Sequence, residues 1–442
     1  MTKRWREEQP AGVSATTTQA GETQARWGWV EPTVWTERML TALEQGVKGG
    51  KWFSLIDKVY TLTNLRSAFQ EVKANRGAAG VDHQTITMFE EHLEENLERL
   101  ARSLKDGSYR PQAVRRVWID KPGSKEKRPL GVPTVRDRVV QAALRHVLEP
   151  IFERDFAEQS YGFRPNRGCK DALRRAQELL NEGYHWVVDA DLKSYFDTIP
   201  HPAMIERVKE KVSDGTVIEI VQAYMKQDIM EGLERWTPEE GTPQGAIISP
   251  MLSNIYLNPL DHEMARKGFQ MVRYADDFVL LCCSQAEAEA ALMELRQWTQ
   301  QAGLTLHPTK TRIVDATQRG GFDFLGYHFE RGMKWPRQKS LSKFKATLRR
   351  KTQRTNGHSL RQIITEVNQT LTGWFAYFKH SLKNTFPPLD KWIRMRLRSI
   401  LRKRRGRKGR GRGRDHQRWP NAFFKAHGLI SLETAHTSEC QS

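Results

Sequence analysis

The sequence predicts an α+β protein in which helices alternate with short strands. Apolar residues recur at helical spacing in several segments, whereas other short apolar runs are bounded by turn residues, which is typical of strands. Two apolar runs within 269–283 enclose a polar tip and so predict a β-hairpin. Segments with helical spacing lie at 32–47, 65–73, 137–152, 169–181 and 285–301.

The N-terminal third begins with a segment of low complexity. Residues 1–24 are rich in Thr, Gln, Ala and Gly without periodicity, which predicts a flexible leader. The helix that starts near Leu65 stops at the glycine-rich turn 75–82. A strand at 114–119 turns through 121–127 and resumes at Arg128, which predicts a second hairpin.

The central third alternates strands and helices. A strand at 186–192 precedes the turn 241–245 and a helix over 249–257. The hairpin of 269–283 has its tip at Ala275-Asp276-Asp277. We expect 304–306 and 313–314 to form a strand pair and 321–329 to form another strand or a hairpin.

The C-terminal third is predicted to be helical. Ser359 and Gln362 match a capping box, which starts an amphipathic helix that ends near His380. Pro387 and Pro388 break this helix, and a further helix starts at Asp390. Glycine interleaved with arginine over 402–414 cannot hold a helix, so this piece is expected to be flexible until it is bound.

Positive charge is concentrated at the C-terminal end. The 442 residues contain 71 Lys+Arg and 52 Asp+Glu, a net charge of +19. From Arg331 onwards there are 28 basic and 5 acidic residues, a net +23, so the preceding residues carry −4. A basic block with interspersed aromatics indicates a nucleic-acid partner, with a solvated basic tail as the alternative.

Composition excludes several other classes of protein. No apolar run is long enough to span a bilayer, and the polar start lacks the apolar region of a secretory signal. The four cysteines form no C-x-x-C pair, which argues against a disulfide scaffold and a cysteine zinc module and favours a reducing compartment. We therefore expect a cytoplasmic protein without a membrane partner.

Two acidic clusters stand in apolar surroundings on or beside predicted strands. Asp189 and Asp191 end the strand of 186–192, and Asp276 and Asp277 lie at the hairpin tip. Grouping carboxylates in an apolar setting is costly unless a cation neutralises them. Hard cations with few protein carboxylates and several substrate oxygens suit nucleotide chemistry, although a lone Asp-Asp pair is also common in turns.

An ordered set of motifs resembles the group II intron reverse transcriptase/maturase family. Tyr274-Ala-Asp-Asp277 is similar to the Tyr-x-Asp-Asp signature, and Asp191-Leu-Lys-Ser-Tyr-Phe196-Asp to the acidic motif before it. Gly241-Thr-Pro-Gln-Gly245 is similar to the Pro-Gln-Gly motif between them. The segments 128–138, 161–168 and 371–378 also match, so the resemblance runs in order from about Trp52 to Ile430.

The resemblance implies a catalytic and metal-binding set of Asp191, Asp276 and Asp277. Asp191 and Asp276 are implied as ligands of two Mg²⁺ ions, with Mn²⁺ as an alternative, and Asp277 lies adjacent. In such a site one ion activates a 3′-hydroxyl and the other steadies the triphosphate and pyrophosphate. Asp189 is interpreted as a structural residue or as a minor contributor to this site.

The resemblance also implies a nucleotide-binding set. Phe196 resembles the steric gate that collides with a ribose 2′-hydroxyl, with a core aromatic as the alternative. Lys121 and Arg128 resemble residues that hold the triphosphate, unless they are solvated turn charges. Gln244 would approach the base pair and template, and Lys310 is a weaker candidate for neutralising or protonating pyrophosphate.

Nucleic-acid binding is assigned to the basic C-terminal region. Its phosphate contacts would give salt-sensitive affinity that does not depend on sequence. The cations and aromatic rings of 402–424 suit RNA or single-stranded DNA, and the family holds a DNA-binding region at this position. The residues chosen for this role are Arg349, Arg350, Arg404, Arg405 and Lys408.

The fold implied by the resemblance is a right-hand polymerase. It would have fingers, a ferredoxin-like antiparallel palm and an α-helical thumb/maturase region. The segment 321–329 resembles the primer grip, although an aromatic core strand would have the same pattern. The expected domains are a leader (1–24), a helical extension (25–64), fingers with the start of the palm (65–182), palm (183–335), thumb/maturase region (336–405) and a basic C-terminal region (406–442).

The resemblance implies an RNA-directed DNA polymerase that binds group II intron RNA and assists splicing and mobility by target-primed reverse transcription. Its partners would be intron RNA, an RNA template with a DNA primer, target DNA and dNTPs, in a bacterial cytoplasm near the nucleoid. A zinc-supported nuclease is not expected, because the only cysteine near Ser442 is Cys440. The alternatives are a splicing maturase with incidental polymerase activity and a domesticated relative in DNA repair or phage defence.

Overall fold

The structure is a computed structural model that describes residues 26–120 and 127–439. The expected leader and Lys121 therefore lie outside the described residues. The chain divides into two compact units. Unit 1 comprises residues 1–115, 131–156 and 201–255, and unit 2 comprises residues 116–130, 157–200 and 256–442.

Unit 1 is mainly helical. The hydroxyl of Thr134 caps α7 by accepting the N–H of Asp137, and side chains on nearly every side of this helix are buried. The apolar face of α4, which includes Leu65, Phe69 and Val72, packs against α7. The helices of unit 1 are α2 (Glu37–Gln45), η1 (Lys48–Gly50), α3 (Ile56–Val59), α4 (Leu62–Ala74), α5 (Ile86–Glu91), α6 (Leu93–Lys105), α7 (Val135–Glu153), α9 (His201–Lys209) and α10 (Gly215–Met225).

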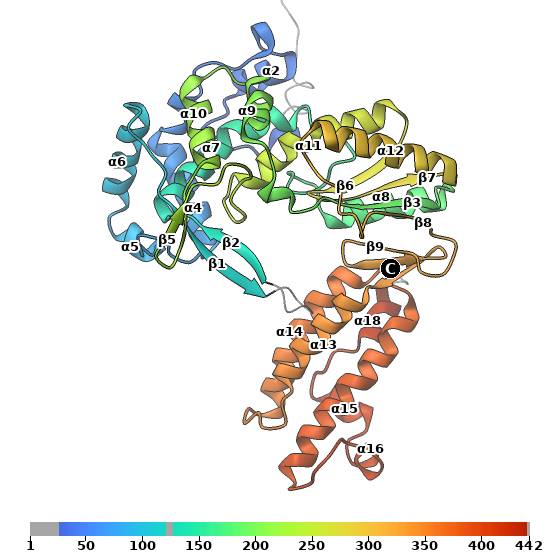
Figure 1. Cartoon of the computed structure of the whole chain (residues 1–442). Coiled ribbons are helices and arrows are strands. Elements are labelled where there is room, and N and C mark those ends of the chain that lie inside the picture. Colours follow the sequence, from blue (N-terminus) through green and yellow to red (C-terminus); the bar gives the residue numbers. More distant parts are fainter. Residues whose placement is uncertain (1–25, 121–126, 440–442) are drawn as a thin grey trace, which may run out of the picture. The chain divides into compact units, whose positions relative to one another are not determined.

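A four-stranded sheet has the order β2-β1-β4-β5 (Figure 1). Its strands are β1 (Val114–Asp120), β2 (Lys127–Val132), β4 (Ile229–Glu231) and β5 (Glu234–Trp236). Strands β1 and β4 run parallel, whereas β4 and β5 are antiparallel. The strands predicted on either side of 121–127 are confirmed.

The main sheet of unit 2 is antiparallel and has the order β6-β7-β3-β8. Together with α11 and α12, the chain order of these strands is βαββαβ, so the sheet has a ferredoxin-like strand order. The elements are β3 (Trp186–Asp191), α11 (Ser249–Arg266), β6 (Gln270–Tyr274), β7 (Asp277–Cys282), α12 (Gln285–Gln301) and β8 (Arg312–Asp315).

Helices cover this sheet. Helix α8 (Cys169–Asn181) contributes Leu173, Ala176 and Leu180 to a core shared with Val187 and Val279 of the strands. Helix α12 contacts β3, β7 and β8, and the Ser284 hydroxyl caps it by accepting the N–H of Glu287. The predicted helices over 169–181 and 285–301 are confirmed at both ends.

A second antiparallel sheet and a helical region complete unit 2. The sheet consists of β9 (Phe322–Phe324), β10 (Tyr327–Glu330) and β11 (Met333–Pro336) in sequence order. It confirms the hairpin alternative for 321–329 and adds β11, which was not predicted. The helices that follow are α13 (Gln338–Lys351), α14 (Leu360–Phe378), η3 (Lys383–Thr385), α15 (Phe386–Arg404), α16 (Arg414–Arg418), α17 (Asn421–Ala426) and α18 (Leu432–Glu439) (Figure 1).

Two sequence predictions of local structure are wrong. Residues 304–306 do not pair with 313–314, because Leu306 forms an isolated bridge with Leu192 and β8 pairs with β3. Helix α15 begins at Phe386 rather than at Asp390 and includes Pro387 and Pro388 in its first turn. Proline is tolerated there because the first N–H groups of a helix have no intrahelical acceptor.

The arginine-glycine stretch is non-helical from Arg405 to Gly413, but the predicted bounds of 402–414 are too wide, because α15 continues to Arg404 and Arg414 begins α16. Part of it folds back on α15, because the N–H of Gly411 donates to the Ser399 hydroxyl. None of the helices among residues 26–120 and 127–439 is both long and apolar enough to cross a membrane.

Candidate active site

The pairing of β3 with β7 brings two distant aspartates together. Asp191, the last residue of β3, lies opposite Asp277, the first residue of β7. Directly opposite residues of an antiparallel pair have Cα atoms about 4.5–5.5 Å apart. The carboxylates predicted to converge from two separate motifs therefore share one edge of the sheet, with Asp276 in the adjoining turn.

The turn between β6 and β7 consists of Ala275 and Asp276. Tyr274 pairs with Asp277, and Ala275 has a φ of 59° in the left-handed region. This conformation is uncommon for a residue other than glycine and carries a small strain. Ala275 is buried, so the surrounding chain holds the turn in this shape.

Burial and neighbouring acidic groups raise the pKa values of the carboxyl groups in and beside this turn. Burial, followed by the charges of Asp276, Asp189 and Asp191, raises the pKa of Asp277 to about 7. The Asp277 residue is nonetheless exposed to solvent, so water screens part of this shift in its pKa. Burial is also the main reason why the pKa of Asp276 is raised, and the charge of Arg128 opposes it.

Two cations partner the aspartates of β3. The ammonium of Lys310 forms an ion pair with the carboxylate of Asp191. The guanidinium of Arg312, on β8, lies 3.3 Å from Asp189, whose pKa is nevertheless raised because burial outweighs this attraction. Lys310 thus contacts a candidate metal ligand, Asp191, whereas Asp189 is paired with Arg312 on the neighbouring strand β8.

The carboxylates fit a divalent cation that also takes ligands from substrate. The parts of the chain that the structure describes contain no group of three or more His, Cys, Asp and Glu side chains arranged to hold a metal by themselves. Asp191, Asp276 and Asp277 supply hard oxygen donors. Burial, followed by the charges of neighbouring aspartates, raises the pKa of Asp277, and a bound cation would favour its charged form. Phosphate oxygens would complete the coordination.

The other predicted nucleotide-binding residues lie on separate segments. Phe196 lies in η2 (Tyr195–Asp197), half-buried, with its ring edge-on to Tyr195 at 5.3 Å between centroids. Arg128, on β2, is exposed. Gln244 belongs to unit 1, where its carbonyl accepts the N–H of Gly131 at 2.6 Å.

Sequence reasoning missed two residues behind the turn of Ala275 and Asp276. Arg273 is the one charged residue of β6, and its side chain is fully buried against Asp261. Gly162 lies so close to the turn that a Cβ atom there would be 2.3 Å from the Ala275 nitrogen. The signals were an arginine within an apolar run and a glycine between two aromatic residues.

The basic residues chosen for nucleic-acid binding are exposed on the helical region of unit 2. Arg349 and Arg350 lie in the last turn of α13, and the Arg349 guanidinium lies over the ring of Trp392 at 5.8 Å. Arg404 donates to the His358 carbonyl, and Arg405 lies over Trp419 at 6.0 Å. Lys408 is in the non-helical stretch after α15.

A core distinct from the sheet core supports these cations. It contains Phe344 and Leu348 of α13, Ile363 and Leu371 of α14, and further apolar residues of α15, α17 and α18. The Ser359 hydroxyl caps α14 by accepting the N–H of Gln362, as the capping-box pattern predicts. The apolar faces are thus buried together, and the basic residues remain accessible to a polyanion.

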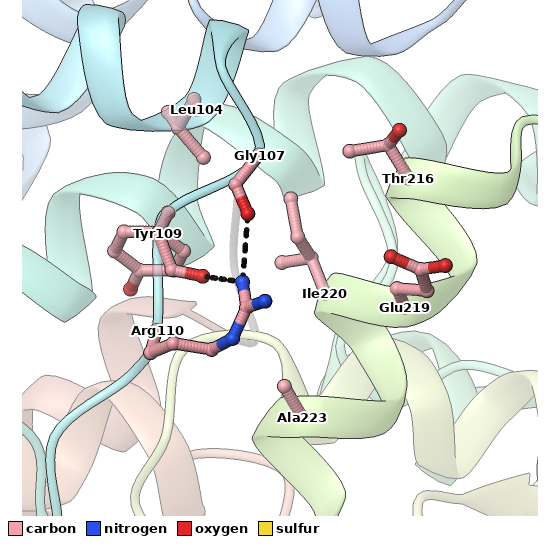
Figure 2. A pocket seen from close by; sticks show the side chains of 8 residues that line it. All are labelled: Leu104, Gly107, Tyr109, Arg110, Thr216, Glu219, Ile220 and Ala223. Carbon is pink, nitrogen blue, oxygen red and sulfur yellow. Dashed lines mark hydrogen bonds between the residues drawn. The ribbon is translucent and has the colours of Figure 1, made fainter.

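Unit 1 contains a small pocket of about 200 Å³ between the end of α6 and α10 (Figure 2). The guanidinium of Arg110 donates to the carbonyls of Gly107 and Tyr109 at 2.8 and 2.7 Å. Glu219 lies across the pocket on α10. Glu219 is the one carboxylate among the lining residues, so this pocket lacks the grouped carboxylates that mark the edge of the main sheet.

Two family models match most of the described chain. A model described as reverse transcriptase (RNA-dependent DNA polymerase) matches residues 119–329. A model described as group II intron, maturase-specific domain, matches residues 341–419. The first match contains all the candidate catalytic aspartates, and the second contains Arg349, Arg350, Arg404, Arg405 and Lys408.

Relatives include two bacterial proteins. The group II intron-encoded protein LtrA of Lactococcus lactis subsp. cremoris is 40% identical over 196 residues, which cover 44% of this chain and 32% of that protein. Protein YkfC of Escherichia coli (strain K12) is 33% identical over 349 residues, which cover 70% of this chain and 86% of that protein. The chain thus spans about a third of the length of LtrA.

Among solved structures, a chain of the partial Cas6-RT-Cas1–Cas2 complex matches 56% of this chain and 41% of its own length, with a TM-score of 0.37 and 25% identity. The matched models define a protein with a reverse transcriptase domain followed by a maturase-specific domain. The chain belongs to the group II intron-encoded reverse transcriptase/maturase family.

Proposed function

We propose that the protein is an RNA-directed DNA polymerase that binds group II intron RNA and assists its splicing and mobility by target-primed reverse transcription. The observation that carries the proposal is the register of β3 against β7, with Asp191 opposite Asp277 and Asp276 beside it. The domains would be fingers (65–182), palm (183–335), a thumb/maturase region (336–405) and a basic C-terminal region (406–442), after the leader (1–24) and the extension (25–64). Such a protein would act in the bacterial cytoplasm, near the nucleoid.

Asp191 and Asp276, with Asp277 adjacent, would hold two Mg²⁺ ions, with Mn²⁺ as an alternative. These ions would favour ionisation of the primer 3′-hydroxyl and neutralise the charge of the triphosphate and pyrophosphate. Lys310, which pairs with Asp191 here, is a cation near the carboxylates that pyrophosphate could engage. Arg128 would bind triphosphate oxygens, together with Lys121, and Gln244 would contact the base pair and template.

The test is primer extension on an RNA template with Mg²⁺, using the wild type and Asp276→Ala. We expect the wild type to incorporate dNTPs and the variant to lose activity by at least about 10³-fold, the scale typical of losing a main electrostatic contributor. Far-UV circular dichroism checks that the variant is folded. No incorporation by the wild type, or equal incorporation by both proteins, contradicts the proposal.

The steric-gate role proposed for Phe196 has its own test. Removing the ring in Phe196→Ala would open space beside the sugar and admit ribonucleotides. We expect the ratio of kcat/KM for dCTP over CTP to fall by about 10- to 100-fold, equivalent to about 1.4–2.8 kcal/mol of discrimination. Tyr195→Phe, next to it on the buried side, serves as the control, and an unchanged ratio in Phe196→Ala would refute the role.

A splicing maturase whose polymerase activity is incidental is the second candidate. It is favoured by the maturase-specific match at 341–419 and by the exposed cations of that region. Splicing of intron RNA by Asp276→Ala separates the two candidates. If splicing persists without polymerase activity, the two roles are independent, and if the wild type splices but never extends a primer, the second candidate is favoured.

A further inference from the structure

Arg273 and Asp261 form a completely buried ion pair behind the catalytic turn. Both side chains have 0% exposure. Such pairs are expensive to desolvate, and replacing them by apolar residues is often neutral or stabilising. Retaining one directly behind a turn of catalytic carboxylates therefore suggests a role in geometry rather than in stability alone.

Hydrogen bonds from the arginine side chain reach both Asp261 and the turn. Its Nε and Nη2 donate to the two oxygens of Asp261 at 2.7 and 2.5 Å. Its Nη1 donates to the carbonyl of Ala275 at 2.9 Å. One planar guanidinium thus joins α11, which carries Asp261, to the turn that carries Asp276.

The backbone of Arg273 is held by hydrogen bonds to the segment 159–161. Its N–H donates to the carbonyl of Gln159 at 2.9 Å, and its carbonyl accepts the N–H of Tyr161 at 2.8 Å. The side-chain amide of Gln159 in turn donates to the backbone carbonyl of Asp261 at 2.6 Å. Both ends of the ion pair are therefore attached to the segment that precedes Gly162.

The Ala275 carbonyl is a direct mechanical link to Asp276. The Ala275 carbonyl and the Asp276 N–H belong to one planar peptide group, so fixing the first fixes the second. Ala275 is in the left-handed region at φ 59°, a conformation that alanine does not favour and that needs outside support.

We propose that Arg273, clamped by Asp261, is a positioning residue that holds the Ala275–Asp276 peptide so that the Asp276 carboxylate is oriented for the catalytic metals. The proposal rests on the proposed polymerase function. It requires the arginine fork, because a lysine ammonium in the same place lacks the rigid set of donors that spans Asp261 and Ala275.

The deciding variant is the double substitution Arg273→Met/Asp261→Leu. It removes the pair without leaving a buried charge, so the protein is expected to fold with a melting temperature within a few degrees of the wild type. Arg273→Lys keeps the charge but loses the fork. For both we expect kcat for primer extension to fall by about 10- to 100-fold, since displacements of about 1 Å can cost that much.

Metal affinity provides a measurement that does not depend on turnover. Mn²⁺ binding is followed by paramagnetic resonance in a complex of the protein with template, dideoxy-terminated primer and dNTP. The half-saturating Mn²⁺ concentration is expected to rise by about fivefold or more in both variants. The half-saturating Mg²⁺ concentration in primer extension should rise in parallel.

Asp214→Asn is the matched control. This buried carboxylate lies in unit 1 and accepts the N–H groups of Leu55 and Ile56 at 2.6 and 2.9 Å. It should lower the melting temperature while leaving the metal dependence unchanged. If the double variant is folded and keeps wild-type kcat and metal affinity, or if Arg273→Lys matches Asp214→Asn, the positioning role is overturned.

The failure of this proposal differs from the failure of the proposed function. A wild-type protein that incorporates no dNTP, although it binds primer and template, would contradict the polymerase assignment. An active wild type whose double variant is equally active would leave that assignment intact and refute the role of Arg273.

Discussion

At the residue scale, placing the carboxylates of Asp276 and Asp277 in a partly buried, acidic setting costs free energy. Burial and neighbouring carboxylates raise the pKa of both groups, that of Asp277 to about 7. A cation that binds only the folded state relieves this repulsion and adds to stability. We therefore expect the folded protein to be more stable when a cation is bound at this turn.

Removal of divalent ions should consequently destabilise the wild type. With Mg²⁺ at about ten times its dissociation constant, we expect about 1.4 kcal/mol of extra stability over the protein in EDTA, a shift of a few degrees. The measurement is a melting curve with and without Mg²⁺. Asp276→Ala should show a much smaller shift, and an equal shift in both proteins would place the effect elsewhere.

At the element scale, the loop before α8 and the β6–β7 hairpin approach each other closely. A Cβ atom on Gly162 would lie 2.3 Å from the Ala275 nitrogen and 2.8 Å from the Tyr274 carbonyl carbon. The contact is between two backbones, so no flexible side chain can move away. Gly162 therefore sets the distance between these elements.

Gly162→Ala should displace the turn. We expect a loss of stability of about 1–3 kcal/mol from overpacking and a loss of primer extension of about 100-fold. Gly215→Ala is the control, because a Cβ atom there meets nothing within 4 Å and its backbone is not left-handed. The comparison uses melting temperature and kcat, and wild-type activity in Gly162→Ala would contradict the packing argument.

Helix α7 carries Glu149, a further acid with a raised pKa, far along the chain from the candidate active site. Burial raises the pKa of Glu149 to about 7, with Glu153 and Glu71 adding to the effect and Arg145 opposing it. The Arg145 guanidinium is 3.5 Å from Glu149 and 2.6 Å from Glu71. One arginine thus serves two carboxylates, and the attraction does not offset the burial.

This raised pKa makes stability depend on pH. The stabilising contribution of protonated Glu149 is fully present below about pH 4.5, its unfolded value, and is lost as the pH rises to about 7. Glutamine does not ionise, so Glu149→Gln should not lose stability as the pH rises. At pH 8 we expect the variant to be more stable than the wild type by about 1–2 kcal/mol. Melting temperatures at pH 5 and 8 give the test, with the exposed Glu95→Gln as control.

At the scale of the whole molecule, charge is divided between the part with the carboxylates and the part with the cations. The residues from Arg331 onwards carry +23, whereas those before carry −4. Phosphate contacts release counterions, so the affinity for RNA should fall steeply with salt. The exposed arginines at the end of α13 are placed to contribute to this.

Arg349→Gln/Arg350→Gln should weaken binding of intron RNA and of unrelated RNA alike. Each lost phosphate contact is expected to lower the slope of log K against log salt by about 0.7–0.9, so the double variant loses up to about 1.8. Filter binding at several salt concentrations measures the slope. Arg66→Gln, whose guanidinium is paired with Glu94, is the control, and an unchanged slope in the double variant would remove these residues from the interface.

The sequence by itself determined the type of most elements, the candidate acidic motifs and the position of the basic region. The helices Cys169–Asn181 and Gln285–Gln301 have the predicted bounds because their caps and apolar spacing are local signals. The carboxylates of 191, 276 and 277 were recognised from motif order, which is also a property of the linear chain.

Only the tertiary structure decided which residues share an environment. The partnership of Arg273 with Asp261, the contact of Gly162 with Ala275 and the raised pKa of Glu149 depend on strand register and helix packing. The same is true of residues 304–306, which lie beside the end of β3 rather than beside β8. Burial and charge pairing are set by atoms distant along the chain, so no local pattern contains them.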